Sequence, residues 1–375
     1  MKIAIVHDWL YGGGAEKVVE EIHRIYPDAP VYATFATDEW RKKLDGQVRT
    51  GYLGKWPFRY LYKFTPLLQQ RWFSSLDLSG YDLVISSCGN GAARFALSKN
   101  KRPGQVHISY THTPTHYYWR KYEEYLKNPS FKPKWLARLG LKILVGHLKK
   151  KDYEAAQKID YLIANSEHIK QDIKNYYGRD SVVVHPPVDT LRFAKNMKPN
   201  GGDRTGSHKK HSFVMWGRLV PYKRFDIAVL ACNQLQIPLT IIGNGPDKER
   251  LMKLAGDTVS FKGWVTEDEM LGIASEASAF IAPQEEDFGI APVEALAAGL
   301  PVIAYKSGGA LDYVASGENG LFFEEQTVES LVNALSKFVE MNFAKELISK
   351  KAHEKFSTKR FHEQIAKFVE SKISD

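Results

Sequence analysis

Two glutamates, Glu286 and Glu294, lie with seven residues between them around a Phe-Gly pair. They belong to the stretch PQEEDFGIAPVEALAAGLPVIA, residues 283–304, whose pattern predicts a helix that begins at about Gly289 with Pro292 in its first turn. Glu286 is then in a loop after the strand AFIAPQ, where its carboxylate can accept hydrogen bonds from sugar hydroxyls. Glu294 lies more than one turn into the helix, where it can accept hydrogen bonds from a ribose.

Backbone amides at the start of this helix form a second candidate binding group. The amides of Phe288, Gly289 and Ile290 lack partners within the helix, and the helix dipole directs them toward an anion. In a simpler interpretation, Glu286 and Asp287 only compensate the positive end of the helix, which is worth about 0.3 to 1 kcal/mol. That interpretation does not explain Glu294, a charged residue inside an apolar helix.

Basic residues follow the first predicted strand of the second half, in the stretch MWGRLVPYKRFDIAV. Arg218 comes directly after Gly217, whereas Lys223 and Arg224 follow a predicted turn at Pro221, just before an apolar helix. Arginine offers a planar fork to a phosphate and lysine offers a point charge, so the group suits a diphosphate. A solvated basic loop is the alternative interpretation.

The first half contributes a glycine turn and a histidine. The glycines at 12–14 stand between the first predicted strand and a helix, where the backbone can approach an anion, although a tight turn without a ligand is the alternative. His112, in YTHTPTHYYW, is expected to hydrogen-bond a substrate hydroxyl, with a structural role as the alternative. Pro114 lies between His112 and His116 and argues against a zinc site on a continuous helix.

Short β-rich apolar runs alternate with helical patterns, which predicts an α/β protein with parallel sheets covered by helices. The stretch 195–211 is polar, glycine-rich and without periodicity, and is expected to be a linker. We therefore predict two Rossmann-like, doubly wound domains at 1–194 and 212–354, with the chemistry in a cleft at the carboxyl ends of their strands. Ser166, before a helical run, is expected to cap that helix rather than to act as a nucleophile.

Composition narrows the class of protein. The chain has 375 residues, 43% of them hydrophobic and 25% charged, so it can bury substantial cores. Cys88 and Cys232 are the two cysteines, too few for a disulfide framework, which fits a reducing compartment. A strand-like run begins directly after Lys2, and no apolar run reaches the length of a membrane span. We therefore expect a cytoplasmic protein without a signal peptide.

The net charge of +9 is concentrated in two segments. Residues 117–151 contain ten Lys and Arg against two Glu, and residues 55–72 contain four basic residues and no acidic one. Both segments are rich in aromatic residues, a mixture expected at anionic lipid headgroups. A solvated basic face and a nucleic acid are the alternatives, the latter without any signature of a nucleic-acid module.

Helical spacing from residue 134 to 151 predicts a basic side beside an apolar stripe of Leu136, Leu139 and Ile143. The predicted membrane-contact residues are Lys134, Arg138, Lys142 and Lys149. We expect this helix to hold the protein peripherally at the inner face of the plasma membrane, near a lipid-linked substrate. In the alternative interpretation, the stripe packs on the first domain's own sheet and the basic residues are merely solvated.

Taken together, GGGAEKV, GRLVPYKR, GNGP and EEDFGIAPVEALAAGLPVIAYKSGGALDYV resemble the family-4 glycosyltransferases of the GT-B fold, over nearly the whole chain. The most specific element is the glutamate pair with its Phe-Gly. EEDFGIAPVEA, VPYKRFDIAV and THTPTHYYWRKYEEYL are similar to bacterial mannosyltransferases that use GDP-mannose to build O-antigen and exopolysaccharide. Residues 355–375 resemble the family's terminal helix, which crosses back to the first domain.

The resemblance implies a role for each matching residue. The implied catalytic residues are Glu286, His112, Arg218 and Lys223. The implied donor-binding residues are Gly13, Gly14, Arg218, Lys223, Val265, Glu286, Phe288, Gly289, Ile290, Ala291 and Glu294. The two cations and the helix amides would neutralise the diphosphate, and Glu286 would hold the donor sugar. Glu294 would hold the ribose, His112 would contact a sugar hydroxyl, and Val265 would line the nucleobase pocket.

The resemblance also implies a reaction that retains the anomeric configuration and needs no metal, and the chain contains no Asp-x-Asp. We expect transfer of mannose from GDP-mannose to a lipid-linked oligosaccharide or related glycan. The alternatives are another donor, such as UDP-glucose or GDP-fucose, and an inactive sugar-nucleotide-binding subunit of a partner transferase. Residues 201–211 lengthen the linker beyond the family's usual need, and no role is predicted for them.

Overall fold

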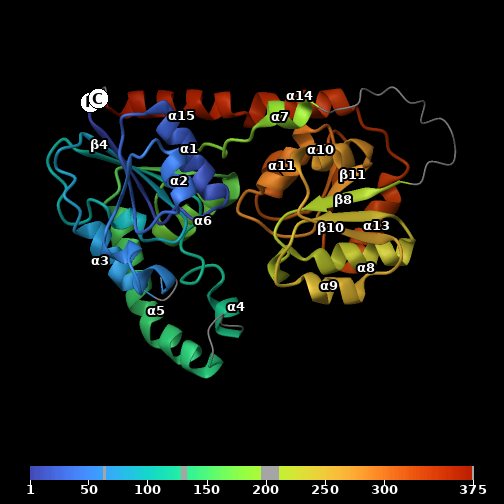
Figure 1. Ribbon diagram of the computed structural model, residues 1–375, viewed down its shortest axis with the longest axis horizontal. Coiled ribbons are helices and arrows are strands. Elements are labelled where there is room, and N and C mark those ends of the chain that lie inside the picture. The colour runs from blue at the N-terminus through green and yellow to red at the C-terminus, as the bar shows by residue number, and fades with distance from the viewer. Residues whose placement is uncertain (62–64, 128–132, 196–210, 374–375) are drawn as a thin grey trace. The chain divides into compact units, whose positions relative to one another are not determined.

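A computed structural model describes residues 1–61, 65–127, 133–195 and 211–373 (Figure 1). The described residues divide into two compact units, Met1–His185 with His362–Asp375, and Pro186–Phe361. Each unit is built on a parallel sheet flanked by helices, which confirms the predicted fold class. The linker expected at 195–211 lies outside the described residues, apart from its two end residues.

The first unit holds a seven-stranded parallel sheet with the order β3-β2-β1-β4-β5-β6-β7. Its strands are β1 (Ile3–His7), β2 (Val31–Ala33), β3 (Val48–Thr50), β4 (Leu83–Cys88), β5 (Val106–Thr111), β6 (Tyr161–Ala164) and β7 (Val182–Val183). The central strands are runs of apolar and β-branched residues because both faces of a parallel sheet are covered. The sequence did not predict β3, since a three-residue strand at the edge of the sheet leaves too short a pattern.

Helices pack around this sheet. They are α1 (Gly14–Ile25), α2 (Asp38–Lys43), α3 (Pro66–Ser74), α4 (Tyr122–Lys127), α5 (Lys134–Gln157) and α6 (Glu167–Tyr177), with the short 3-10 turns η1 (Tyr52–Gly54), η2 (Phe58–Tyr60) and η4 (Ala93–Phe95). The hydroxyl of Ser166 accepts a hydrogen bond from the Ile169 amide at 3.1 Å, so the predicted N-cap of α6 is confirmed.

The second unit holds a six-stranded parallel sheet with the order β10-β9-β8-β11-β12-β13. Its strands are β8 (Phe213–Trp216), β9 (Leu239–Ile242), β10 (Val259–Gly263), β11 (Ala279–Ala282), β12 (Val302–Tyr305) and β13 (Gly320–Phe323). Successive side chains of a strand point to opposite faces. Met215 therefore joins the core on one face of the sheet, and Trp216 joins the core on the other face.

Helices cover both faces of the second sheet (Figure 1). They are α7 (Thr190–Ala194), the 3-10 turn η5 (Pro221–Lys223), α8 (Phe225–Leu235), α9 (Lys248–Leu254), α10 (Glu267–Glu276), α11 (Ile290–Ala297), α12 (Ala310–Tyr313), α13 (Val328–Phe338) and α14 (Lys345–Phe356). Phe193 of α7 is buried in the second unit's core. The division at His185 therefore differs from the domain boundary expected at 194.

The last helix, α15 (Thr358–Ile373), begins in the second unit and continues in the first. Phe361, Ile365 and Val369 are buried along one stripe of the helix. His362 Nε2 lies 2.8 Å from Glu21 Oε2 of α1, a contact within the first unit.

Candidate active site

The carboxyl ends of β8 and β11 lie side by side in the middle of the second sheet, where the strand order changes direction. Arg218 follows β8 and Glu286 follows β11, so two of the predicted site residues lie at this point. In doubly wound sheets, ligands bind at such a switch point. The fold therefore places these residues where a ligand is expected.

The loop after β8 gives its three basic residues different surroundings. Arg218 is exposed, whereas Lys223 on η5 is largely buried. Arg224 adopts a positive φ of 51° and directs its guanidinium to Asp226 and Gln326. Arg224 therefore supports the loop itself, and Arg218 and Lys223 stay the candidate phosphate contacts.

Lys223 and Glu286 form an ion pair. Lys223 Nζ lies 3.1 Å from Glu286 Oε1, and 15% and 18% of the two side chains are exposed. Burial acts to lower the pKa of Lys223, but the negative charge of Glu286 opposes it and the net pKa is raised. Lys223 is therefore positively charged at neutral pH. The sequence assigned these residues to different parts of one donor, and the structure brings their side chains together.

The loop that carries Glu286 is held by a glycine pair after β12. The Gly309 amide donates to the Glu286 carbonyl at 2.8 Å. A Cβ atom at Gly308 would lie 2.3 Å from that carbonyl oxygen, and one at Gly309 would lie 2.3 Å from the carbonyl oxygen of Phe288. Such close backbone contact requires glycine at both positions. Both glycines lie in the stretch AYKSGGALDYV, but nothing in that stretch indicated that they support the loop of Glu286.

Helix α11 begins as predicted. Gly289 is its N-cap with a φ of 99°, and Ile290 is its first helical residue. Ile290 and Ala291 pack partly buried against the core. The Phe288 ring is buried and meets the Tyr313 ring edge to face, so its side chain belongs to the core. The expected contribution of Phe288 to a ligand site is therefore its backbone amide.

Glu294, on α11, accepts a hydrogen bond from Trp216 Nε1 at 3.0 Å. The sequence did not predict this contact, although a buried tryptophan generally needs a partner for its N–H group. Val265 follows β10 and packs partly buried against the same core as Trp216. Its predicted place beside a nucleobase stays a prediction.

In the first unit, the glycine turn opens α1. Gly13 is the N-cap, Gly14 is the first helical residue, and both are exposed. Glu16 Oε1 accepts a hydrogen bond from the Gly12 amide at 3.1 Å, and a Cβ atom at Gly13 would lie 2.9 Å from Glu16 Oε2. Glu16 therefore holds the turn in place, and the approach of Gly13 and Gly14 to a diphosphate stays a prediction.

His112 follows β5 and is tied to the neighbouring strand. Its Nε2 lies 2.8 Å from Ser87 Oγ at the end of β4, while His7 Nδ1 donates to the Ser87 carbonyl at 2.7 Å. The buried Asp8 carboxylate accepts four backbone amides from the loop at 89–93, at 2.7 to 3.0 Å. The ends of β1, β4 and β5 thus form one hydrogen-bonded group around His112, whose role toward a substrate stays a prediction.

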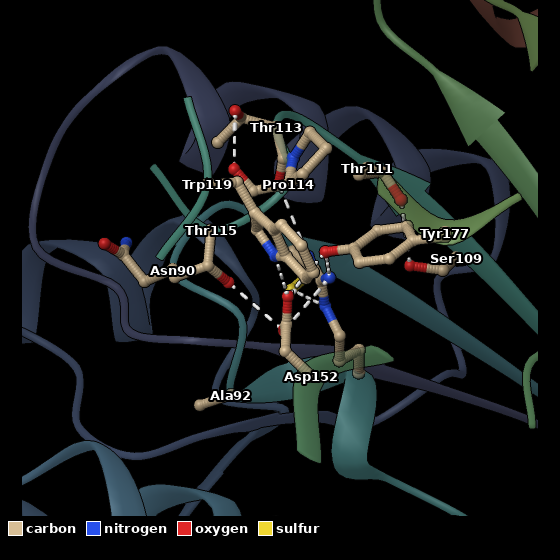
Figure 2. Close-up of polar contacts among 12 residues, drawn as sticks. Asn90, Ala92, Ser109, Thr111, Thr113, Pro114, Thr115, Trp119, Asp152 and Tyr177 are labelled. Carbon is tan, nitrogen blue, oxygen red and sulfur yellow. Dashed lines mark hydrogen bonds and ion pairs between the residues drawn. The ribbon is translucent and has the colours of Figure 1, made fainter. Parts of the chain in front are cut away.

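A buried polar network anchors the segment that follows β5. Figure 2 shows Thr115, Trp119 and Tyr177 directed toward the Asp152 carboxylate, with Trp119 Nε1 and the Tyr177 hydroxyl each donating at 2.7 Å. Arg94 Nη1 lies 3.1 Å from Asp152 Oδ1, and the side chains of both are almost fully buried. Burial raises the pKa of Asp152, which the Arg94 charge opposes. The network fixes the chain beyond His112, and the sequence did not predict it.

The predicted membrane-contact residues lie on α5 in different surroundings. Arg138 donates to two carbonyl groups at the end of α4, at 2.9 and 2.8 Å. Lys149 Nζ lies over the Trp119 ring, 5.3 Å from its centroid. Lys134 and Lys142 are exposed. Arg138 and Lys149, two of the four predicted membrane-contact residues, therefore interact with other groups of the first unit.

The apolar stripe of α5 is exposed. In Figure 1 the first half of α5 extends beyond the sheet, with α4 beside it. The exposed fractions are Trp135 65%, Leu136 45%, Leu139 48%, Ile143 69% and Leu144 42%. The alternative that this stripe packs on the first domain's sheet is therefore wrong. Trp56 and Tyr60, in the other basic segment, are also largely exposed.

No group of three or more His, Cys, Asp or Glu side chains within 1–61, 65–127, 133–195 and 211–373 could hold a metal ion. In the same ranges, no helix combines the length and the apolar character needed to cross a bilayer. Independence from metal stays a prediction.

The sequence matches two families of known proteins. It matches Glycosyltransferase Family 4 over residues 12–192 and Glycosyl transferases group 1 over residues 203–357. A curated relative, the GDP-mannose-dependent alpha-(1-6)-phosphatidylinositol monomannoside mannosyltransferase of Mycobacterium tuberculosis, is 33% identical over 178 residues, which is 41% of this chain and 45% of the relative. The chain spans about half the length of the curated relatives that it matches.

Solved structures show the same fold. Anabaena Alr3699/HepE in complex with UDP superposes with a TM-score of 0.70 at 19% identity, covering 99% of this chain and 100% of that one. Sucrose-phosphate synthase from Thermosynechococcus elongatus superposes with a TM-score of 0.71 at 16% identity, covering 100% of both chains. The paired parallel sheets and the two family matches agree, and the chain belongs to the family-4, group 1 glycosyltransferases of the GT-B fold.

Proposed function

We propose that this chain transfers mannose from GDP-mannose to a lipid-linked oligosaccharide or related glycan, with retention of the anomeric configuration. One observation carries the proposal. The largely buried Lys223–Glu286 ion pair lies beside the first turn of α11, at the switch point of the second sheet. A cation, a carboxylate and helix amides then surround the place where a sugar diphosphate is expected.

This arrangement suits the charges of glycosyl transfer. The transition state places negative charge on the leaving diphosphate and positive charge near the anomeric carbon. Lys223, Arg218 and the α11 amides stabilise the diphosphate, and Glu286 accepts hydrogen bonds from the donor sugar. Because Lys223 and Glu286 are paired, an arriving diphosphate competes with Glu286 for the ammonium group. Binding of the donor thus frees Glu286 for the sugar.

The remaining residues complete the proposed donor site. Glu294 accepts the ribose hydroxyls, Val265 lines the nucleobase pocket, and His112 bonds a sugar hydroxyl. The backbone at Gly13 and Gly14 is proposed to contact the diphosphate. The charge of the leaving group is met by side chains and amides, so no metal takes part in the proposed reaction.

The choice of donor is supported by the name of the mycobacterial relative, which uses GDP-mannose. A UDP-sugar is the second candidate, because the fold relative Alr3699/HepE was solved with UDP. An inactive binding subunit is the third. The presence of Glu286, Glu294, Arg218 and Lys223 together speaks against inactivity.

We also propose that α5 holds the protein at the cytoplasmic face of an anionic membrane, where a lipid-linked acceptor would be found. The exposed apolar stripe from Trp135 to Leu144 lies beside the exposed cations Lys134 and Lys142. An apolar strip flanked by basic residues is the pattern of a helix that lies in a membrane interface.

The proposal is tested with radiolabelled sugar nucleotides and a polyprenyl-diphosphate oligosaccharide. Incorporation of label from GDP-mannose, and less from UDP-glucose or GDP-fucose, is the expected result. Glu286→Ala should reduce turnover more than GDP affinity, because the nucleotide does not depend on the sugar contact. An equal loss of both would show that Glu286 has another role, and absence of transfer from every donor would contradict the enzymatic function.

A further inference from the structure

We infer that Trp216 is a positioning residue for the donor: its indole N–H group orients the Glu294 carboxylate that receives the ribose. The inference rests on the proposed role of Glu294 and adds a second residue to it. Trp216 itself does not touch the nucleotide in this account, so its effect on binding passes through Glu294.

The contact joins two elements of the second unit. Trp216 is the last residue of β8. Because successive side chains of a strand point to opposite faces of the sheet, the Trp216 side chain lies on the face that α11 covers. Its Nε1 atom lies 3.0 Å from Glu294 Oε2, and 7% of the residue is exposed. A charge-assisted hydrogen bond from a buried donor is stronger than a neutral one. The Trp216 indole at the end of β8 thus fixes the orientation of the Glu294 carboxylate on α11.

Aromatic neighbours fix the indole ring. The Phe193 ring of α7 lies parallel to it, with centroids 6.5 Å apart and an interplanar angle of 6°. The Phe280 ring of β11 meets it edge to face, with centroids 4.5 Å apart and an angle of 68°. A ring held on two sides cannot turn its N–H group away, so the donor direction is set by the core.

A fixed carboxylate suits a ribose. An ionised glutamate has about four acceptor directions, and the indole N–H group of Trp216 takes one of them. A glutamate held in one orientation loses less side-chain freedom when the ligand binds, and preorganisation raises affinity. The pairing also satisfies the buried indole N–H group, which would otherwise lack a partner.

The test compares nucleotides with and without ribose hydroxyls. Affinities of GDP and 2′,3′-dideoxy-GDP are measured by calorimetry, together with UDP and 2′,3′-dideoxy-UDP so that the base does not decide the outcome. The wild type should prefer the hydroxylated member of a pair, and Glu294→Ala should abolish that preference. Trp216→Phe, which removes the N–H group and keeps an aromatic ring, should weaken the hydroxylated nucleotide about tenfold and leave the dideoxy nucleotide nearly unchanged.

Two controls separate positioning from packing. Phe193→Leu disturbs the ring stack but keeps the N–H group, and should reduce the preference less than Trp216→Phe does. Trp216→Phe in the Glu294→Ala background should cause no further loss. If Trp216→Phe shows no cooperative melting transition, Trp216→Met, which also lacks a hydrogen-bond donor, takes its place in the same measurements.

The outcomes distinguish the inference from the function on which it rests. Equal weakening of both nucleotides by Trp216→Phe, or no weakening at all, overturns the positioning role and leaves Glu294 in place. If Glu294→Ala keeps the wild-type preference, the ribose role of Glu294 fails and the positioning role fails with it. If neither nucleotide pair binds the wild type, the proposed donor site itself is wrong.

Discussion

Lys223, a proposed contact of the diphosphate, depends on its ion-pair partner. Its ammonium group is largely buried and would be costly to keep charged without a partner. Glu286, across the switch point of the sheet, provides that partner and raises the pKa of Lys223 against the effect of burial. Arg218, by contrast, is exposed to solvent. We therefore expect substitutions of Arg218 and of Lys223 to differ in severity.

We expect Arg218→Ala and Lys223→Ala to weaken donor binding and turnover, because the diphosphate charge is left uncompensated. Loss of a charge-assisted contact costs about 1.5 to 3 kcal/mol, roughly a ten- to hundredfold change. Lys223→Ala should be the more severe, since it also leaves Glu286 without its ion-pair partner. Calorimetry with GDP and initial rates measure both quantities, with the exposed Lys253→Ala as a control. Normal affinity and turnover in both variants would remove the proposed phosphate site.

A second residue-scale prediction concerns acid stability. Burial lowers the pKa of His107 on β5 to about 4 from an ordinary 6.5, with Asp160 acting in the opposite direction. Between these two pH values, the unfolded chain binds a proton that the folded chain does not. The contribution of His107 is therefore fully present above pH 6.5 and is lost as the pH falls toward 4, by about 1.4 kcal/mol per pH unit.

We expect the urea midpoint of the wild type to fall between pH 7 and pH 5 by more than that of His107→Gln. Glutamine can still reach Ser86, which lies 2.9 Å from His107 Nε2, but it does not titrate. Unfolding curves at the two pH values supply the comparison. Parallel pH dependence in the two proteins would show that His107 contributes nothing to acid sensitivity.

At the scale of an element, α5 combines a buried end with an exposed one. Leu148, Asp152, Ala155 and Ala156 anchor its second half in the first unit. Its first half presents Trp135, Leu136, Leu139 and Ile143 to the outside. A row of exposed apolar side chains on a helix indicates a surface that contacts another apolar medium, such as the interior of a lipid membrane.

We expect the protein to sediment with anionic liposomes and not with zwitterionic ones, less strongly at high salt. Lys134→Ser with Lys142→Ser should weaken sedimentation, because each cation near an anionic surface contributes about 1 kcal/mol. Lys253→Ser with Lys262→Ser, which removes two exposed charges from the second unit, is the matched control. Equal recovery in the supernatant with both liposome types at low salt would contradict the membrane contact and leave the transferase proposal intact.

At the scale of the whole molecule, both units are parallel α/β sheets, and the proposed reaction uses cations of the protein instead of a metal. We therefore expect EDTA to leave the rate of sugar transfer nearly unchanged. Initial rates measured with and without chelator, and again after addition of Mg²⁺ or Mn²⁺, show whether sugar transfer depends on a metal ion. Complete loss of activity that either ion restores would show that a metal carries the diphosphate charge.

Local sequence patterns predicted most strands of this protein and the starts of some of its helices. Runs of β-branched and apolar residues predicted the strands of both sheets except β3, since a buried parallel strand is recognisable from its own residues. The start of α11 near Gly289 and the cap at Ser166 were also predicted, because capping depends on residues within one turn. Motifs in the sequence identified the family, which the matches over 12–192 and 203–357 agree with.

The contacts between distant side chains depend on the tertiary structure. Trp216 and Glu294 lie 78 positions apart, and Arg94 and Asp152 are likewise far apart in the chain. Such contacts depend on strand order and on the face to which each residue points. The periodicity of a segment predicts whether it is a helix or a strand, but not which other elements pack against it. Glu294 could therefore be identified from the sequence as a candidate site residue, whereas its hydrogen bond to Trp216 at the end of β8 could not be predicted.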